Sequence, residues 1–135
     1  MSAEETIVPR RSLLYMPGAN RRALEKAQSI DCDTIIFDLE DAVACSAKAQ
    51  ARAQVEAALG DYQYRYRELV VRCNGLETEW GLDDLRTFAT APISALLFPK
   101  IESSEQISRI KKELAALGST LPLWIMIETA SGVLN

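Results

Sequence analysis

The sequence predicts an α/β fold in which strands and helices alternate around a parallel sheet. Five short apolar runs recur along the chain, and stretches with helical character separate them. Alternation of this kind is typical of βαβ units, which contain parallel strands. The 135 residues, 48% of them hydrophobic, suffice for one core of ordinary size and are too few for two well-formed domains. Residues 1–135 are therefore predicted to form a single unit.

The five predicted strands are rich in Val, Ile, Leu and Phe. Their hydrophobicity is nearly continuous rather than alternating, as expected for parallel strands that are covered on both faces. The runs are Ser12–Met16, Thr34–Leu39, Glu68–Cys73, Ala95–Pro99 and Leu123–Glu128.

Four predicted helices connect these strands. They are Arg21–Ser29, Ala47–Leu59, Trp80–Ala89 and Ser104–Leu117. The last is the best defined, because Ser103 and Gln106 have the spacing of a capping box and Gly118 follows as a stop. Its apolar residues recur at spacings of three and four, which predicts a buried face. These residues are Ile107, Ile110, Leu114 and Leu117. The tyrosine-rich segment Asp61–Arg67 is predicted to be a surface loop that leads into the third strand.

Composition excludes several classes of partner. Nineteen acidic and 15 basic residues give a formal charge of −4, the wrong sign for neutralising nucleic-acid phosphates. The N-terminus lacks the apolar stretch of a signal peptide, and no later run approaches the roughly 18–20 apolar residues that span a bilayer. A soluble, cytoplasmic protein without a membrane partner is predicted. The three cysteines, Cys32, Cys45 and Cys73, lack a C-x-x-C pair and are expected to be reduced.

The sequence contains no histidine. This excludes Ser-His-Asp and Cys-His nucleophile pairs, and every metal site that needs imidazole. Any metal must therefore bind to oxygen ligands, which favours magnesium, calcium or manganese over zinc or copper.

Every predicted strand ends in polar or charged side chains. In a parallel α/β sheet or barrel, active-site groups cluster in the loops beyond the carboxyl ends of the strands. A single polar strand end is usually just a solvated loop, but five successive cases indicate a functional edge. The segments are Pro17–Asn20, Asp38–Asp41, Arg72–Asn74, Lys100–Glu102 and Glu128–Thr129.

Four carboxylates at this edge could supply an oxygen-ligand magnesium site, with water and substrate completing the octahedron. They are Glu40, Asp41, Glu102 and Glu128. Two structural alternatives remain open. Asp41 could instead cap or orient the loop before the next helix, and the side chain of Asp38 could point into the sheet and be hydrogen-bonded there.

Arg72 follows three apolar residues and would be hard to solvate there unless it faces a cleft. Its planar guanidinium suits bidentate binding of a carboxylate. The alternative is a salt bridge to Glu40 or Glu102. Pro17 and Gly18 could form a backbone turn that approaches a ligand closely, although Pro-Gly is more often only a turn.

Five motifs that occur in order along the chain resemble the citrate lyase beta subunit-like family. They are RSLLYMPGAN (Arg11–Asn20), IFDLEDAV (Ile36–Val43), VRCN (Val71–Asn74), FPKIE (Phe98–Glu102) and MIET (Met126–Thr129). The resemblance covers nearly the whole chain from Arg10 onward, and five ordered motifs are far more specific than any one of them.

The resemblance implies a TIM barrel, a magnesium cofactor, and a malyl-, citramalyl- or citryl-type thioester of coenzyme A or an acyl-carrier cofactor as substrate. Glu128 then resembles a direct magnesium ligand, and Arg72 resembles the group that holds the oxoacid carboxylate. The residues that resemble the surrounding shell are Glu40, Asp41, Asn74, Lys100 and Glu102. Magnesium would polarise the hydroxyacid oxygen and favour its deprotonation. Bond cleavage would release a 2-oxoacid and the enolate of the acyl thioester, which is then protonated.

Two other functions remain open beside this carbon–carbon lyase. One is a metal-dependent aldolase that acts on free 2-oxoacids, without dependence on coenzyme A. The other is a noncatalytic chain that binds a ligand or a partner subunit.

The implied barrel is incomplete in this sequence. A closed barrel needs eight strands and typically about 250 residues, whereas about five βα units are predicted up to Asn135. The family's second magnesium-ligating aspartate follows the sixth strand, beyond Asn135. We therefore expect an N-terminal portion of such an enzyme. The exposed edge of the fifth strand predicts self-association into a homo-oligomer.

Overall fold

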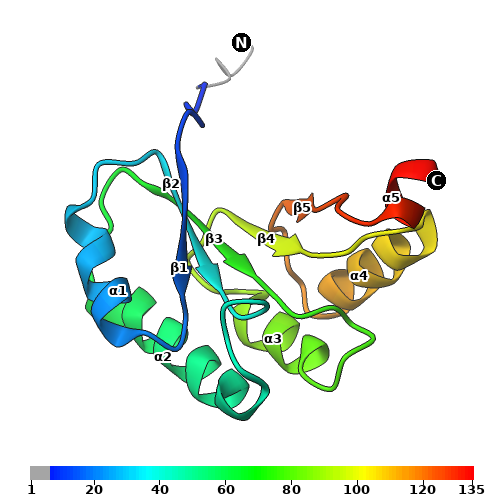
Figure 1. Ribbon diagram of the computed structural model, residues 1–135, viewed down its shortest axis with the longest axis horizontal. Helices are drawn as coiled ribbons and strands as arrows, with labels where there is room; N and C mark the ends of the chain where they lie inside the picture. Colours follow the sequence, from blue (N-terminus) through cyan, green and yellow to red (C-terminus); the bar gives the residue numbers. More distant parts are fainter. Residues whose placement is uncertain (1–6) are drawn as a thin grey trace.

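The computed structural model describes residues 7–135, which form a five-stranded parallel sheet with helices between the strands (Figure 1). The strands are β1 (Leu13–Pro17), β2 (Thr34–Asp38), β3 (Glu68–Arg72), β4 (Ala95–Phe98) and β5 (Leu123–Ile125). The helices are α1 (Arg21–Lys26), α2 (Lys48–Asp61), α3 (Gly81–Phe88), α4 (Ser104–Ala116) and α5 (Ala130–Leu134). Short 3-10 turns, Ala27–Ser29 and Cys45–Ala47, flank α1 and α2. The predicted alternation of strand and helix is confirmed.

The strands lie in the sheet in the same order as in the sequence. Each pair is parallel, and the register aligns Pro17 with Asp38 and Asp38 with Arg72. The carboxyl ends of β1, β2 and β3 therefore end level with one another. Side chains that end these strands are brought to one edge, as expected for a parallel α/β sheet.

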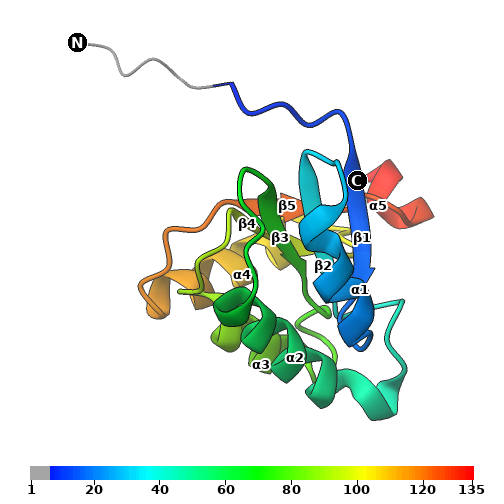
Figure 2. The same ribbon diagram turned by 90° about the vertical axis from the view of Figure 1, so that its left-hand side faces the viewer.

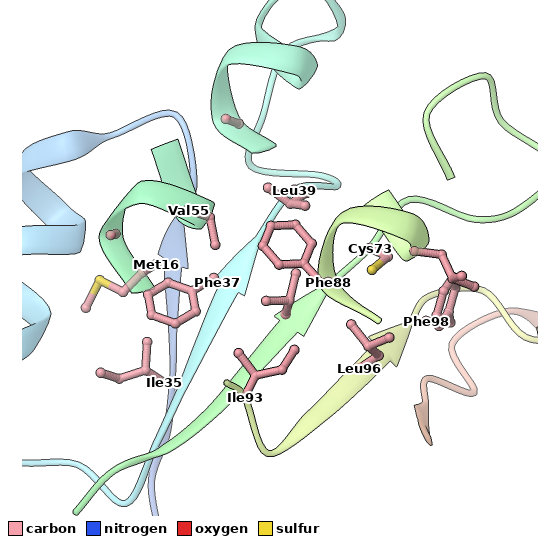
Figure 3. Packing of buried hydrophobic residues seen from close by; sticks show 14 of the residues in the cluster. Met16, Ile35, Phe37, Leu39, Val55, Cys73, Phe88, Ile93, Leu96 and Phe98 are labelled. Atoms are coloured by element: carbon pink, nitrogen blue, oxygen red, sulfur yellow. The ribbon is translucent and has the colours of Figure 1, made fainter. Parts of the chain in front are cut away.

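Helices α1 to α4 cover one face of the sheet (Figure 2). The main core lies between them and the strands, and three phenylalanines, Phe37, Phe88 and Phe98, are fully buried within it. Figure 3 shows Phe88 of α3 among residues from the loop after β2 and from β4. Burial of such apolar surface is the dominant stabilising contribution to folding.

A smaller apolar cluster occupies the opposite face of the sheet. It contains Ile36, Val70, Ala95 and Leu97, with Trp124 and Met126 packed against it. The guanidinium of Arg10 lies 4.9 Å from the centroid of the Trp124 ring and forms a two-point ion pair with Glu68. Both faces of the central strands are thus covered, which explains their continuous hydrophobicity.

The end of the fifth strand differs from the prediction. The regular ladder stops at Ile125 rather than at Glu128, because β4 itself ends at Phe98 and Pro99 has no N–H to continue it. Met126 still exchanges backbone hydrogen bonds with Phe98 and Ile101. The chain therefore remains beside β4 while leaving regular strand geometry.

Helix α4 matches its predicted start. The Ser103 hydroxyl accepts a hydrogen bond from the Gln106 N–H, and Gln106 bonds back to the Ser103 N–H, which completes the capping box. Gly118 follows the helix with a φ of +69°. Ile110 and Leu114 are buried, but Leu117 is 39% exposed, so the predicted apolar face is one residue too long.

The tyrosine-rich segment is only partly a surface loop. Its first residue, Asp61, ends α2, and Tyr64 is buried with its hydroxyl donating to the Leu24 carbonyl at 3.0 Å. Arg67 is also buried, and its guanidinium donates to the Ile30 carbonyl. This segment therefore packs against α1 and the short turn that follows it.

In the described part of the chain, no helix combines the length and the apolar composition needed to cross a bilayer. The three cysteines are free thiols, two of them buried.

Candidate active site

Charged side chains from three successive strand ends meet at the carboxyl edge of the sheet. The carboxylate of Glu40, in the loop after β2, lies between Arg72 at the end of β3 and Lys100 just after β4. The Lys100 ammonium binds Glu40 and lies 3.3 Å from Asp41 Oδ1. The structure therefore brings together four of the predicted site residues.

Arg72 is fixed by Asp38, its neighbour in the sheet register. Its Nε and Nη2 donate to the two carboxylate oxygens of Asp38 at 2.7 and 2.6 Å. Those oxygens also accept the backbone N–H groups of Glu40 and Ala42. The alternative in which Asp38 is hydrogen-bonded within the sheet is confirmed, and this carboxylate orients Arg72 and the loop together.

The remaining end of the Arg72 guanidinium faces the site. Nη1 lies 3.2 Å from Glu40 Oε2, so the predicted alternative of a salt bridge to Glu40 is also present. No pairing of Arg72 with Glu102 occurs within residues 7–135. Nε and Nη2 donate to Asp38, and Nη1 also donates to Met126 Sδ at 3.8 Å. A ligand carboxylate can therefore use the outer side of Nη2, and Nη1 only by displacing Glu40 or Met126. A ligand carboxylate therefore cannot bind Arg72 in a bidentate manner that uses Nε.

Tyr15 of β1 contributes an aromatic surface that the sequence analysis did not single out. The Arg72 guanidinium carbon lies 4.8 Å from the Tyr15 ring centroid, within cation–π distance. Burial raises the pKa of the Tyr15 phenol above its ordinary value, and the charges of Asp38, Glu40 and Glu128 add to this against the opposing charge of Arg72. Tyr15 is therefore a neutral hydrogen-bonding group at neutral pH.

The two cationic groups of the site keep their protons. Burial lowers the pKa of Arg72, but the hydrogen bonds and charge of Asp38 outweigh it and leave the pKa above its usual value. The hydrogen bond to Glu40 raises the pKa of Lys100, against a smaller opposing effect of burial. Lys100 is therefore an ammonium that supplies positive charge, and it is unsuited to act as a general base.

Within residues 7–135, one oxygen of Glu40 has no hydrogen-bond partner. Glu40 is buried, and its Oε2 lies near Arg72 without hydrogen-bond geometry. A buried carboxylate oxygen without a donor is unfavourable, since its lost hydration is not replaced. The charge of the Arg72 guanidinium, 3.2 Å away, offsets part of this cost.

Lys100 links this cluster to Glu128. Its backbone N–H donates to Glu128 Oε1 at 2.9 Å, while its side chain reaches back to Glu40. Lys100 has a φ of +54°, a left-handed conformation that is uncommon for residues other than glycine. Such strain is frequently found at functional sites, and here it directs the N–H and the ammonium to two different carboxylates.

At Lys100, replacement by glycine is expected to leave a more stable protein than replacement by alanine, by roughly 1 kcal/mol. Both variants lose the ammonium, but only alanine keeps a Cβ in the left-handed backbone. Urea denaturation measures the difference. At exposed Lys112 within α4 the order should reverse, since glycine is less favourable than alanine inside a helix. The same order at both positions would contradict the left-handed conformation of Lys100.

The predicted residues Pro17, Gly18 and Asn74 lie at the same edge but have structural contacts. The Gly18 N–H donates to the Asp38 carbonyl at 2.8 Å, and a Cβ on Gly18 would lie 2.9 Å from that oxygen. Gly18 is therefore required for close packing of β1 on β2. Asn74 is buried, and its amide nitrogen donates to the Leu39 carbonyl and to Asp84. Its predicted contact with substrate stays a prediction.

The carboxylates of Glu102 and Asp41 are less fixed. Glu102 is half-buried, and within the described residues its side chain has no hydrogen-bond partner, although its backbone N–H donates to Gln106. Asp41 is exposed and contacts Lys100, and in this part of the chain its carboxylate accepts no hydrogen bond from the start of α2. The capping alternative for Asp41 is therefore not observed.

The residues of this chain fit a magnesium ion in part. Glu128 offers a hard carboxylate oxygen, and Mg²⁺ commonly uses only one or two protein carboxylates with water and substrate. Between residues 7 and 135, however, no three acidic or cysteine side chains lie close enough to chelate a metal. Glu40 and Asp41 are already neutralised by Lys100 and Arg72. Among residues 7–135, Glu102 and Glu128 are the predicted site carboxylates without a cationic partner, and metal binding by them stays a prediction.

Sequence reasoning missed two contributors to the site. Asp38 was considered only as a structural residue, although its alignment with Arg72 follows from pairing the second and third strands at their last residues. Tyr15 carried no signal beyond its place in the first strand. Its contact with Arg72 crosses β2, so it depends on side-chain direction in three dimensions.

Comparison with known proteins identifies relatives across almost the whole chain. Residues 11–135 match the model of the HpcH/HpaI aldolase/citrate lyase family. The (3S)-malyl-CoA thioesterase of Cereibacter sphaeroides strain ATCC 17029 is 50% identical over 127 residues, which are 94% of this chain and 43% of that protein. The citrate lyase subunit beta of Leuconostoc mesenteroides is 35% identical, over 93% of this chain and 44% of its own length. The chain thus spans less than half the length of these relatives.

Solved structures agree with this relationship. The citrate lyase beta subunit of Mycobacterium tuberculosis complexed with oxaloacetate and magnesium superposes with a TM-score of 0.72 at 26% identity. The match covers 93% of this chain and 52% of that one. Another structure of this M. tuberculosis protein contains magnesium, acetoacetate and coenzyme A, and has the same TM-score. The five parallel βα units are therefore part of a TIM-barrel fold, as predicted. The chain belongs to the HpcH/HpaI aldolase/citrate lyase family.

Proposed function

We propose that this chain carries part of the active site of a magnesium-dependent lyase that cleaves a hydroxyacyl-coenzyme A thioester. The substrate is of the (3S)-citramalyl, malyl or citryl type, and the products are a 2-oxoacid and an acetyl thioester. The observation that carries the proposal is the meeting of Arg72, Lys100 and Glu128 at the carboxyl edge of the sheet. Solved relatives that contain magnesium with oxaloacetate, or with coenzyme A, support it.

Arg72 binds the carboxylate of the oxoacid part of the substrate through the outer side of Nη2, and through Nη1 once Glu40 or Met126 is displaced. Asp38 holds the opposite side of the guanidinium, so its direction is set before substrate binds. Orienting a reactant in this way lowers the entropic part of the barrier. Tyr15 shields the face of the guanidinium from water.

Glu128 is the proposed magnesium ligand within this chain, and the Lys100 N–H fixes its carboxylate. When bound, magnesium polarises the hydroxyl oxygen of the substrate and favours its deprotonation. Lys100 and Arg72 add positive charge near the oxygens that become more negative as the bond breaks. Glu40, which pairs with Arg72 and Lys100, is the proposed centre of the surrounding shell, together with Asp41, Glu102 and Asn74.

A second candidate is hydrolysis of the thioester. The observation that favours it is the 50% identity to a protein named (3S)-malyl-CoA thioesterase. The same groups would serve, because both reactions bind a hydroxyacid carboxylate and polarise an oxygen. The difference lies in the bond that breaks, carbon–carbon in one case and carbon–sulfur in the other. A metal-dependent aldolase is separated from both by its independence of coenzyme A.

The experiment that tests the proposal measures turnover of malyl- and citramalyl-coenzyme A by the purified chain with magnesium. A lyase releases glyoxylate or pyruvate with acetyl-coenzyme A, whereas a thioesterase releases free thiol and no 2-oxoacid. We expect Glu128→Ala to abolish turnover, and exposed Glu56→Ala in α2 to leave it unchanged. Absence of turnover by a folded sample would contradict catalysis by these residues and favour a noncatalytic, ligand-binding chain.

Homo-oligomer formation through the free edge of β5 stays a prediction. The strand is hydrogen-bonded to β4 on one side, and Ile125 and Ile127 are exposed beside it. Light scattering of the purified chain measures this association, and a monodisperse monomer would contradict it.

A further inference from the structure

Lys48 is a buried lysine without an acidic partner in the described residues. It is the first residue of α2, and its side chain is almost entirely shielded from solvent. Its ammonium donates to the backbone carbonyls of Leu39 and Glu40, at 2.9 and 2.6 Å. The ring of Trp80 lies beneath it, with its centroid 5.3 Å from Nζ.

This position is unfavourable for a cation on general grounds. Burial removes the hydration of the ammonium, and the first turn of a helix carries the positive end of the helix dipole. Two charge-assisted hydrogen bonds and the aromatic face offset that penalty. A long apolar side chain would fill the same space without the cost of burying a charge. The ammonium therefore has a role beyond packing, and the two carbonyls indicate what that role is.

Both carbonyls belong to the loop that leaves β2 and carries Glu40 and Asp41. The Leu39 carbonyl also accepts from the Asn74 amide at 3.0 Å, so it is held from two sides. Asn74 is itself fixed by the buried carboxylate of Asp84, which pairs with Arg52 of α2 at 2.7 Å. The loop is thus tied to β3, to α2 and to α3 at one point.

The backbone of Glu40 is fixed on both sides of its side chain. Its N–H donates to Asp38 and its carbonyl accepts from Lys48. Its carboxylate can therefore stay between the Arg72 guanidinium and the Lys100 ammonium. Without Lys48, the Glu40 carbonyl would keep only the N–H of Val43 in the same loop.

We propose that Lys48 is a positioning residue that holds the Leu39–Asp41 loop and thereby places the Glu40 carboxylate in the site. Asn74 acts with it through the shared Leu39 carbonyl. The effect on catalysis rests on the proposed function, whereas the effect on the loop does not. The two parts are therefore tested by different measurements.

Hydrogen exchange of the loop amides is the first measurement. We expect Lys48→Met to accelerate exchange of the Ala42 and Val43 amides about tenfold or more, because the loop loses two hydrogen bonds to a charged group. The β4 amides of Leu96 and Leu97 report global opening and should change much less. Exposed Lys111→Met in α4 is the matched control and should change neither set.

Chemical rescue separates the ammonium from the side-chain volume. In Lys48→Ala, added n-propylammonium supplies the missing atoms and should restore part of the loop protection. Where the chain turns over a hydroxyacyl-coenzyme A, Lys48→Met should lower kcat about tenfold with a smaller change in KM, since the metal ligand Glu128 and Arg72 remain.

Unchanged exchange of the loop in Lys48→Met would overturn the proposal. Equal acceleration in the loop and in β4 would also overturn it, because Lys48 would then contribute only to overall stability. If the wild-type chain shows no turnover, the proposed function fails, but the exchange and rescue measurements still decide the role of Lys48.

Discussion

Replacing Asp38 with asparagine is expected to lower the free energy of unfolding by roughly 3 kcal/mol, because it leaves the buried Arg72 cation without its carboxylate. Asparagine has the same shape but only one accepting oxygen. It cannot satisfy the guanidinium together with the N–H groups of Glu40 and Ala42, which Asp38 does now. Urea denaturation followed by circular dichroism measures the change.

The matched control is Asp83→Asn in α3. Asp83 is 60% exposed and lies 3.8 and 3.9 Å from Arg86 and Arg52, so it forms ion pairs at the surface. Such pairs contribute less than about 1 kcal/mol, and a correspondingly small change is expected. A loss at Asp38 as small as that at Asp83 would mean that Arg72 is not held as the structure shows.

The Asp38→Asn variant also tests the role of Arg72 in the candidate site. Because Asp38 fixes the direction of Arg72, its loss should weaken substrate binding and turnover together, whereas loss of Glu128 should act through the metal. If Asp38→Asn turned over substrate as fast as the wild-type chain does, Arg72 would have no part in the reaction.

Phe88→Ala is expected to destabilise the protein by about 3–5 kcal/mol, the usual range for truncating a buried phenylalanine. Phe88 ends α3 and is fully buried between that helix and the sheet (Figure 3). Its removal leaves a cavity that the surrounding side chains cannot fill without moving from their rotamers. Thermal and urea denaturation both report the loss.

Leu117→Ala provides the comparison for this core variant. Leu117 follows α4 and is 39% exposed, so a much smaller loss of about 1 kcal/mol or less is expected. A small loss at Phe88 would contradict its close packing and indicate a site that collapses around the missing ring.

Periodicity and capping chemistry predicted most of the fold, because these signals are local. The capping box of Ser103 and the continuous apolar runs depend on a few neighbouring residues. The end of β5 depended on Pro99, which directly follows β4, and α5 (Ala130–Leu134) has too few residues to show a period. Tyr64 looked like part of a surface loop, but its hydroxyl reaches Leu24, which lies 40 positions earlier in the chain.

The positions of the strand ends predicted which residues share the candidate site. Glu40, Arg72 and Lys100 lie at or just beyond the ends of successive strands, so a parallel sheet must bring them to one edge. Their pairings were not determined, because the choice between Asp38 and a ligand as partner of Arg72 depends on side-chain direction. The sequence does not indicate the role of Lys48, because a lysine in an alanine-rich helix is expected to be solvated. Its burial is evident only in the structure.

The order of the strands in the sheet also bears on how the site assembles during synthesis. Every strand pairs with the strand that directly precedes it in the chain, so each new βα unit can add to a template that is already present. The Asp38–Arg72 ion pair needs only residues up to the end of β3, whereas Lys100 joins Glu40 one unit later. The ion pair that orients the arginine can therefore form from fewer residues than the network that includes the left-handed Lys100.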